Sequence, residues 1–240
     1  NDSKSAIIAG VGPALGSALL DEFSKVGYVS CGLSRSIISP FPPQKGIGEN
    51  QSVTSAAICV RKAADVADYP SLDTAISEFL ADHPPLHVAV YNAARFLHKP
   101  FEATSPEEFT EIWETNFLGA VHFAKRVIPE LSKTGGTLIF TGATASVRGG
   151  DGFSAFASSK FALRGLAQSL ARTYQNKGVH IAHAVLDGTI AHSAASAPYR
   201  ADEEHSLQPA DIAKCYLNII RQPRSAWTHE FDLRPYTETF

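Results

Sequence analysis

Two stretches in the second half of the chain carry the residue types best suited to chemistry. One is the apolar, β-branched run 136–143, and the other is the Ala-rich segment 153–163, in which Lys160 follows Phe156 by one helical turn. Glycines bound the first run, which predicts a buried parallel strand, whereas the second has the periodicity of a helix. The loop between such a strand and its helix lies at the carboxyl edge of an α/β sheet, where ligands bind. We therefore expect Ala143, Phe156 and Lys160 to face a ligand site.

The spacing of these residues resembles the active-site segment of the short-chain dehydrogenase/reductase family, which is a Ser, twelve residues, then Tyr-x-x-x-Lys. Ala143 stands at the Ser position, Phe156 at the Tyr position and Lys160 at the Lys position. The resemblance implies that Lys160 binds the nicotinamide ribose of a cofactor. In the family the Tyr transfers a proton and the Ser donates a hydrogen bond to the substrate oxygen. Phe156 and Ala143 do neither, and such losses cost about 10²- to 10⁴-fold for the acid and roughly 10²- to 10³-fold for the donor.

Hydroxyl groups close to Ala143 are candidates to replace the missing donor. Thr144 and Ser146 are the best placed by sequence, although hydrogen bonding to loop backbone is the commoner role of such residues. Asp187 stands where the family usually has a Pro before Gly188. Its carboxylate could serve as a base or bind a cationic substrate, and an ordinary Asp-Gly turn is the alternative.

A long helix is predicted from Ser105 onward, because a capping residue, a proline and two acidic residues precede apolar residues at helical spacing. Asn116 lies on the apolar face, 27 residues before Ala143. The family resemblance implies that an Asn at this interval bends the helix and holds a water that relays protons to Lys160. The apolar stripes on this helix and on residues 153–175 predict a homodimer or homotetramer interface, with an intramolecular core as the alternative.

A glycine-rich turn follows the first apolar strand, which is predicted at residues 5–9. Gly10, Gly12 and Gly16 have the spacing GxGxxxG, and an amphipathic helix that includes Leu15 begins there. Such a turn lets backbone N–H groups and the positive end of a helix approach a pyrophosphate. It resembles the TGxxxGxG loop of the family, and a tight connection in any α/β protein is an equal alternative.

The end of the second predicted strand, 28–33, bears on cofactor choice. Ser34 and Arg35 follow it, and no acidic residue is present there. A protein that selects NAD places a carboxylate near this point to bind the ribose 2′-OH, whereas a 2′-phosphate requires a cation and hydroxyl donors. The sequence therefore favours NADP(H), and a solvated arginine at a strand end is the alternative.

Further cofactor contacts are implied by the resemblance alone. Asp65 and Val66 match a pair that contacts the adenine, although Asp65 also suits a helix cap. Asn92 matches an Asn on the adenine side, with a purely structural role as the alternative, and the backbone near Ile190 would hold the carboxamide. The full set assigned to the cofactor is Gly10, Gly12, Leu15, Gly16, Ser34, Arg35, Asp65, Val66, Asn92, Lys160, Gly188 and Ile190.

The fold class expected from strands alternating with helices is α/β, a three-layer doubly wound (Rossmann) fold with about seven parallel strands. We expect residues 1–240 to form a single NAD(P)-binding domain. Prolines and glycines in residues 36–54 predict a mobile surface loop, with a short helix possible after Ser52. Residues 191–208 lack a period and are interpreted as a substrate lid. A last strand is predicted over residues 227–233.

Composition excludes several classes of function. A net charge of −3 without a basic run argues against nucleic acid as a partner. No apolar run reaches the roughly 20 residues of a membrane span, so we expect no membrane partner. Three scattered cysteines suggest a reducing, cytoplasmic location and apolar core positions. No cluster of metal ligands is recognisable, and we expect no metal.

Two functional hypotheses follow. The first is an NADP(H)-dependent oxidoreductase of atypical mechanism that acts on a small carbonyl or alcohol. Protonation would come from Thr144, Ser146, a lid residue or water held by Asn116. The second is a cofactor-binding but redox-silent protein, either a sensor or a non-redox catalyst.

Overall fold

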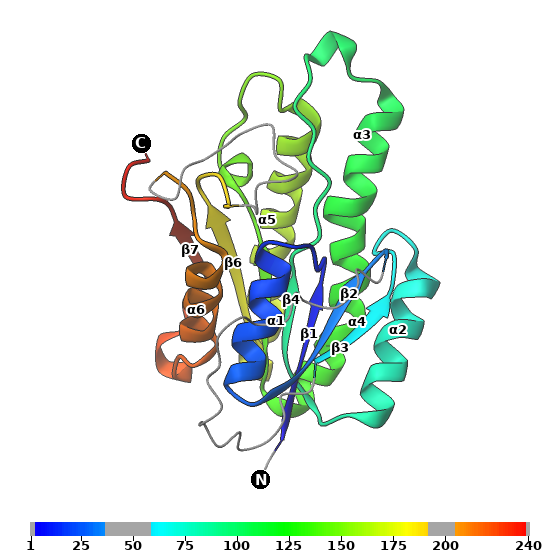
Figure 1. Ribbon diagram of the computed structural model, residues 1–240, viewed down its shortest axis with the longest axis vertical. Coiled ribbons are helices and arrows are strands. Elements are labelled where there is room, and N and C mark those ends of the chain that lie inside the picture. Colours follow the sequence, from blue (N-terminus) through cyan, green and yellow to red (C-terminus); the bar gives the residue numbers. More distant parts are fainter. Residues whose placement is uncertain (1–2, 37–58, 192–204, 239–240) are drawn as a thin grey trace, which may run out of the picture.

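Seven parallel strands form the central sheet of the computed structural model, which describes residues 3–36, 59–191 and 205–238 (Figure 1). The strand order is β3-β2-β1-β4-β5-β6-β7. The strands are β1 (Lys4–Ala9), β2 (Tyr28–Ser34), β3 (Cys59–Ala63), β4 (Leu86–Tyr91), β5 (Thr137–Thr141), β6 (His180–Leu186) and β7 (Glu230–Leu233). The α/β class and the doubly wound topology predicted from the sequence are confirmed.

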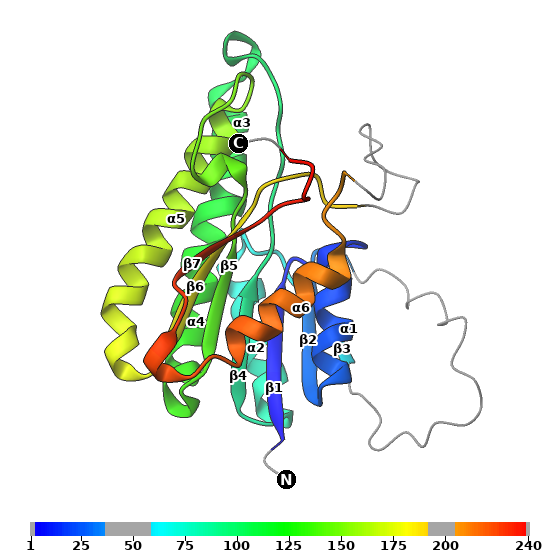
Figure 2. The same ribbon diagram turned by 90° about the vertical axis from the view of Figure 1, so that its left-hand side faces the viewer.

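Helices cover both faces of this sheet (Figure 2). One face carries α1 (Leu15–Lys25) and α6 (Pro209–Ile220), which contact each other. The opposite face carries α2 (Tyr69–Asp82), α4 (Gly119–Thr134) and α5 (Ser154–Tyr174), and α3 (Pro106–Trp113) leads into α4. Short helical turns lie at Phe101–Ala103, Glu114–Leu118, Thr144–Ser146, Gln175–Lys177 and Arg224–Ala226.

The core consists of two apolar layers separated by the sheet. Neighbouring residues of one strand enter opposite layers, as Ile7 packs towards α2 and α4 while Ile8 packs towards α1 and α6. Since both faces are covered, the central strands are apolar along most of their length, which explains the near-continuous apolar runs in the sequence.

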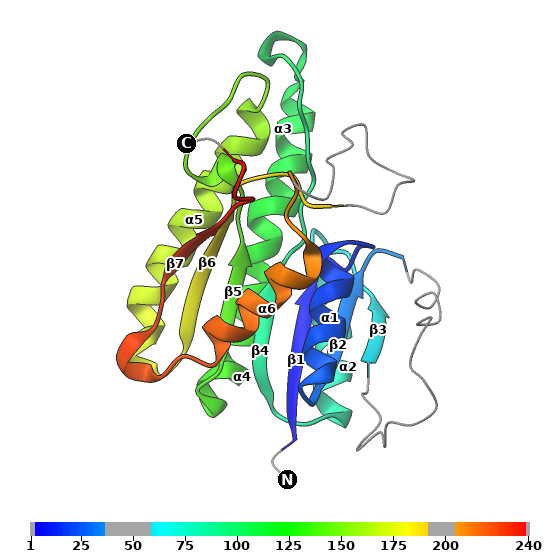
Figure 3. The same ribbon diagram turned by 60° about the vertical axis from the view of Figure 1, so that its left-hand side comes forward.

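The direction in which the chain adds strands to the sheet reverses between β1 and β4. From β1 the chain proceeds outward to β2 and β3 on one side, and from β4 it proceeds to β5, β6 and β7 on the other (Figure 3). Ligands of such sheets bind in the crevice outside the carboxyl ends of the strands at this switch point. The candidate residues that follow β1, β4, β5 and β6 therefore share one edge.

The predicted long helix is confirmed, with one irregular turn in its middle. Ser105 caps it, as its Oγ accepts from the Glu108 N–H at 3.2 Å while its own N–H donates to Glu108 Oε2 at 2.9 Å. Residues Glu114–Leu118 form a π-helical turn between α3 and α4. Such turns occur often at functional sites, and this one contains Asn116.

Several local predictions need correction. Asp68, not Asp65, caps α2, because its side chain accepts from the Ser71 N–H at 3.4 Å. Cys59 is exposed rather than part of the core. The last strand begins at Glu230, three residues later than expected. The predicted loop 36–54 lies outside the described residues except for Ser36, and the predicted lid lies outside them over 192–204.

Candidate functional site

The amine of Lys160 is buried next to the carboxyl end of a central strand. The residue lies in the second turn of α5 and is 2% exposed. Its Nζ donates to the carbonyl oxygen of Thr141, the last residue of β5, at 2.9 Å. Burial lowers the pKa of Lys160 to about 8, because desolvation disfavours the charged form. The amine is thus poised to exchange a proton near neutral pH.

Phe156 forms an apolar wall one turn before this amine. Its ring is 8% exposed, and its centroid lies 5.7 Å from Lys160 Nζ. The ring of Phe96 meets it edge-on at 5.3 Å between centroids and is itself 61% exposed. Ala143, Ala145, Phe153 and Ala157 pack with Phe156 in the same apolar cluster. The side chains that border Lys160 here provide aromatic surface and no proton.

Asn116 joins three parts of the site. Its Oδ1 accepts from the Arg95 N–H at 2.7 Å, and its Nδ2 donates to the Arg95 carbonyl at 3.1 Å and to Ser159 Oγ at 2.9 Å. The side chain therefore fixes the loop after β4 against α5, next to Lys160. These contacts give Asn116 a positioning role, whereas the water relay implied by the resemblance stays a prediction.

Tyr91 stabilises the π-helical turn through a hydrogen bond. Its hydroxyl donates to the Thr115 carbonyl at 2.5 Å. A Cβ added at Gly119 would lie 2.4 Å from that hydroxyl oxygen, so the close approach of the helix to β4 requires glycine. Burial raises the pKa of the Tyr91 phenol well above its usual range, and the group is a structural donor.

The two hydroxyls nominated from the sequence differ in their surroundings. Ser146 is fully buried, and its Oγ accepts from the Ala143 N–H at 3.1 Å, which is the loop-stabilising role kept as an alternative. Thr144 is half-buried, and its Oγ1 donates to Asp187 Oδ1 at 2.5 Å. The other oxygen of Asp187 lies 3.3 Å from Arg234 Nη2. Sequence reasoning missed Arg234 as a partner, because nothing local links the C-terminal segment to the end of β6.

The glycine turn after β1 fits a dinucleotide. Gly10 has φ of 91°, and an added Cβ would lie 2.3 Å from the Ala93 nitrogen, so no other residue fits there. Asn92 Nδ2 donates to the Gly10 carbonyl at 2.9 Å and ties the turn to the end of β4. At Gly12 an added Cβ would meet nothing within 4 Å, so this stretch of backbone is open to an approaching phosphate.

The remaining cofactor candidates are placed unevenly. Arg35 is exposed at the end of β2, next to Ser34, whose Oγ donates to the Ser36 carbonyl at 2.7 Å. Leu15 and Val66 are core residues, 4% and 7% exposed, which leaves mainly their backbone for a ligand. The other candidates lie at strand ends or in the glycine turn. Gly16 packs on Val11, and Asp65 accepts a hydrogen bond from the Ala67 N–H at 3.0 Å. Gly188 has φ of 149°, and Ile190 forms a β-bridge with Leu207.

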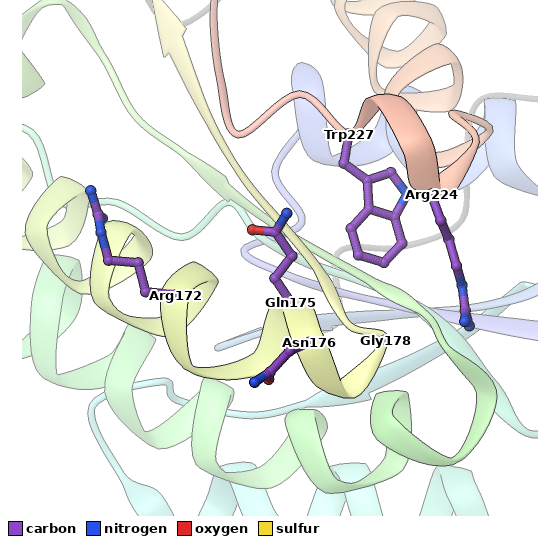
Figure 4. Close-up of a pocket in the computed structure, with 6 residues that line it drawn as sticks. All are labelled: Arg172, Gln175, Asn176, Gly178, Arg224 and Trp227. Carbon is purple, nitrogen blue, oxygen red and sulfur yellow. The ribbon is translucent and has the colours of Figure 1, made fainter.

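A groove of about 430 Å³ lies at the opposite, amino-terminal edge of the strands (Figure 4). Its lining residues are Arg172, Gln175, Asn176, Gly178, Arg224 and Trp227. The side chains of Arg172 and Arg224 point away from each other, so no two charges converge on a ligand. This groove is separate from the residues described above and has no nucleophile or base directed into it.

Metal and membrane chemistry have little support in the described residues. Within residues 3–36, 59–191 and 205–238, no three His, Cys, Asp or Glu side chains gather as metal ligands would. In the same ranges, no helix has the length and apolarity needed to cross a bilayer.

The doubly wound sheet, the glycine turn at its switch point and the buried lysine beside it define an α/β protein of the dinucleotide-binding class. The family model described as short chain dehydrogenase matches residues 4–204, and the chain belongs to this family of oxidoreductases. The resemblance inferred from the sequence is thus confirmed at the level of the family.

Related sequences include two proteins that are named as reductases. A 3-dehydrosphinganine reductase of Arabidopsis thaliana is 29% identical over 177 residues, which cover 72% of this chain and 50% of that protein. A 3-ketodihydrosphingosine reductase of Mus musculus is 26% identical, covering 73% of this chain and 53% of that protein. The chain spans about half the length of these relatives.

Solved structures show the same architecture over almost the whole chain. A short-chain dehydrogenase from Rhodopseudomonas palustris is 26% identical with a TM-score of 0.77, covering 97% of this chain and 99% of that one. An alcohol dehydrogenase from Thermococcus sibiricus, solved with 5-hydroxy-NADP, has a TM-score of 0.82 at 21% identity and covers 99% of each chain. The second likeness shows the fold alone.

Proposed function

We propose that this protein is an NADP(H)-dependent oxidoreductase that acts on a small carbonyl or alcohol compound by an atypical route. The observation that carries the proposal is the position of Lys160, buried at the carboxyl edge with its Nζ on the last residue of β5. That edge also carries the open backbone at Gly12. Lys160 would keep the family role of binding the nicotinamide ribose, although Phe156 replaces the tyrosine with which this lysine usually acts.

The chain offers groups for each part of the cofactor. Lys160 would hold the ribose hydroxyls next to the nicotinamide, and the turn from Gly10 to Gly16 would receive the pyrophosphate. Arg35 and Ser34 would bind a 2′-phosphate, since a guanidinium and hydroxyl donors suit that group. NADP(H), when bound, supplies or accepts a hydride. The presence of NADP or NADPH in related structures supports this choice.

Proton transfer must come from a group other than Phe156. Thr144, Ser146, a residue of the 191–208 segment and water near Asn116 are the candidates. The geometry favours Thr144, because Ser146 is fully buried and bonded within its loop, and both polar atoms of Asn116 are engaged. Lys160 is a second titratable group at the same edge.

The substrate is proposed to be largely apolar. Phe96, Phe153 and Phe156 form a cluster in which Phe96 is well exposed, and aromatic surfaces of this kind bind apolar ligands. Relatives named as a 3-dehydrosphinganine reductase and as a hydroxynaphthalene reductase support a substrate with a carbonyl or hydroxyl group on an apolar framework.

A redox-silent binding protein is the competing proposal, and one observation favours it. The usual acid and the usual oxyanion donor are both absent, replaced by Phe156 and Ala143, whose side chains cluster together. In that case the site would bind NADP(H) as a signal, or would hold a substrate for a reaction without hydride transfer.

Titrating NADPH and NADH by fluorescence, followed by a screen of carbonyls and alcohols for absorbance change, separates these proposals. The wild type is compared with Phe156→Tyr and with Ala143→Ser/Phe156→Tyr. Turnover by the wild type supports the oxidoreductase. Tight NADPH binding with turnover only in the double variant supports the redox-silent protein, and no binding of either nucleotide overturns both.

Assembly and location are also proposals. Trp113, Leu118 and Phe161 on the helices of the α5 side are 37–44% exposed, which fits a homodimer or homotetramer interface. We propose a cytoplasmic location without nucleic-acid or membrane partners. Light scattering of the purified protein tests the assembly.

A further inference from the structure

We propose that Thr144 and Asp187 form a proton-accepting pair that binds the hydroxyl group of an alcohol. This inference deepens the proposed oxidoreductase function and rests on it, since it assigns the direction of the reaction and the chemical class of the substrate.

The first step is the direction of one hydrogen bond. Thr144 Oγ1 donates to Asp187 Oδ1 at 2.5 Å. An ionised carboxylate only accepts, so the single hydrogen of Thr144 is committed to Asp187 and only lone pairs remain on Oγ1. A ligand that meets this oxygen must bring a donor. A hydroxyl group satisfies that requirement and a carbonyl group does not.

The second step is access. Asp187 is 7% exposed and has Arg234 Nη2 3.3 Å from its second oxygen, so a ligand does not reach the carboxylate directly. Thr144 is half-buried and lies between Ala143 and Ala145, which both contact the Phe156 cluster. Thr144 is therefore the member of the pair that is more open to a ligand, since Asp187 is buried.

The proton path follows from this order. The O–H bond of the alcohol breaks and its proton goes to Thr144 Oγ1, while the Thr144 hydrogen moves to Asp187 Oδ1. The oxidant would be the oxidised nicotinamide of the proposed function, which would accept the hydride of the carbinol carbon. The products are a carbonyl compound, the reduced nicotinamide and a protonated Asp187, so atoms and electrons balance.

The competing explanation is structural. Asp187 and Arg234 link the end of β6 to the segment after β7, and this link alone could require the carboxylate. Arg234→Gln separates the two roles, because it removes the ion pairs of Arg234 with Asp187 and Asp232 and leaves the bond between Thr144 and Asp187 in place. It is the matched control for Asp187→Asn.

The test uses 1-phenylethanol and acetophenone, which differ only in the functional group and suit the aromatic cluster. Binding is measured by calorimetry in mixtures that cannot react, the alcohol with NADPH and the ketone with NADP⁺, and again for both compounds without nucleotide. We expect the wild type and Thr144→Ser to bind the alcohol about tenfold more tightly than the ketone. Thr144→Val removes the oxygen that accepts from the alcohol. Asp187→Asn introduces an amide that can donate to Thr144 and so frees the Thr144 hydrogen for a carbonyl. Both variants should reduce this preference to about twofold or less.

Melting temperatures measured on the same variants complete the test. Arg234→Gln should lower the melting temperature and keep the alcohol preference. The inference is overturned if the wild type binds the ketone equally or better, if it binds neither compound, or if Arg234→Gln and Asp187→Asn lose the preference alike. Failure of NADPH to bind overturns the proposed function instead, and the measurement without nucleotide still decides the role of the pair.

Discussion

A buried ammonium group with little compensation is the main feature of the site at the scale of single residues. Within residues 3–36, 59–191 and 205–238, Lys160 Nζ has one hydrogen-bond acceptor, the Thr141 carbonyl, and it lies 5.7 Å from the centroid of the Phe156 ring. Charged groups are costly to bury unless they are paired and hydrogen-bonded. Burial lowers the pKa of Lys160 to about 8, which reflects this cost. The proposed role in cofactor binding would explain why a lysine is kept at a position where it does not favour stability.

Replacing Lys160 by Met should therefore stabilise the fold and weaken cofactor binding. We expect the free energy of unfolding at pH 7 to rise by about 1–3 kcal/mol, because the desolvation penalty disappears. The wild type should gain stability between about pH 8 and pH 10.5, where the unfolded state holds more protons, and Lys160→Met should not. Urea denaturation at several pH values measures both effects. Lower stability of the variant at pH 7 would contradict the prediction.

His183 provides a second prediction for a single residue, which concerns the stability of the fold at acidic pH. Burial lowers the pKa of His183 to about 4, against the partial opposition of Glu230, whose Oε2 lies 3.0 Å from its Nδ1. The neutral ring is required in the folded state, so stability should fall as the pH drops from about 6.5 to 4, by about 3 kcal/mol in all.

The matched variant for this effect is His183→Gln, which cannot become charged. It should flatten the acid side of the stability profile while keeping a hydrogen-bond donor towards Glu230. Profiles of equal slope for the variant and the wild type would mean that another group controls acid denaturation. Chemical denaturation between pH 4 and pH 7 makes the comparison.

The π-helical turn is the element on which the site depends at the next scale. It brings Asn116 to the loop after β4 and to α5 at once, through bonds to Arg95 and Ser159. Tyr91 supports it through the Thr115 carbonyl, and Gly119 allows the helix to lie against that phenol.

Tyr91→Phe and Gly119→Ala should therefore interact. The first leaves a buried carbonyl without its donor and should cost about 1–3 kcal/mol. The second places a methyl group against the Tyr91 hydroxyl and should cost a similar amount. The double variant should lose less than the sum by about 0.5 kcal/mol or more, because removing the hydroxyl relieves the shortest contact of the added methyl group. The contact with the Val66 carbonyl oxygen at 2.9 Å remains in both variants that carry alanine. Additive losses in urea melts would show that the two residues act separately.

At the scale of the whole molecule, the switch point between β1 and β4 gathers residues from distant parts of the chain. Gly10 and Asn92 meet there through a 2.9 Å hydrogen bond, although 82 positions separate them. A dinucleotide bound at this edge would extend from the end of β2 to the loop after β5. It would thus contact both halves of the sheet, and its binding should stabilise the whole fold.

Ligand stabilisation tests this arrangement together with cofactor choice. NADPH at about 100 times its dissociation constant should add about 2.7 kcal/mol to the free energy of unfolding. Arg35→Ala should weaken NADPH binding about tenfold and leave NADH binding unchanged, because only NADPH carries the 2′-phosphate. Thermal melts with each nucleotide measure the difference, and equal losses for both nucleotides would remove the role proposed for Arg35.

Sequence patterns predicted those parts of the fold that depend on local preferences. An apolar run followed by a glycine turn predicts β1, an apolar run bounded by glycines predicts β5, and Ser105 with Glu108 predicts the start of α3. Asp65 was assigned less well, because Asp65 and Asp68 both precede α2 and only backbone geometry decides which one caps it. The exposure of Cys59 likewise depends on its place at the edge of the sheet.

By itself, the sequence predicted the family and the doubly wound fold, and it put Ala143 and Phe156 at the positions where the family pattern has Ser and Tyr. Strand and helix periodicity, the glycine turn and the spacing around Lys160 are all local features. Only the tertiary structure decided what surrounds these residues. Burial at the end of β5 shifted the pKa of Lys160, and the neighbouring ends of β5 and β6 joined Thr144 to Asp187. Desolvation and contacts between distant segments arise from packing, which no short sequence pattern encodes.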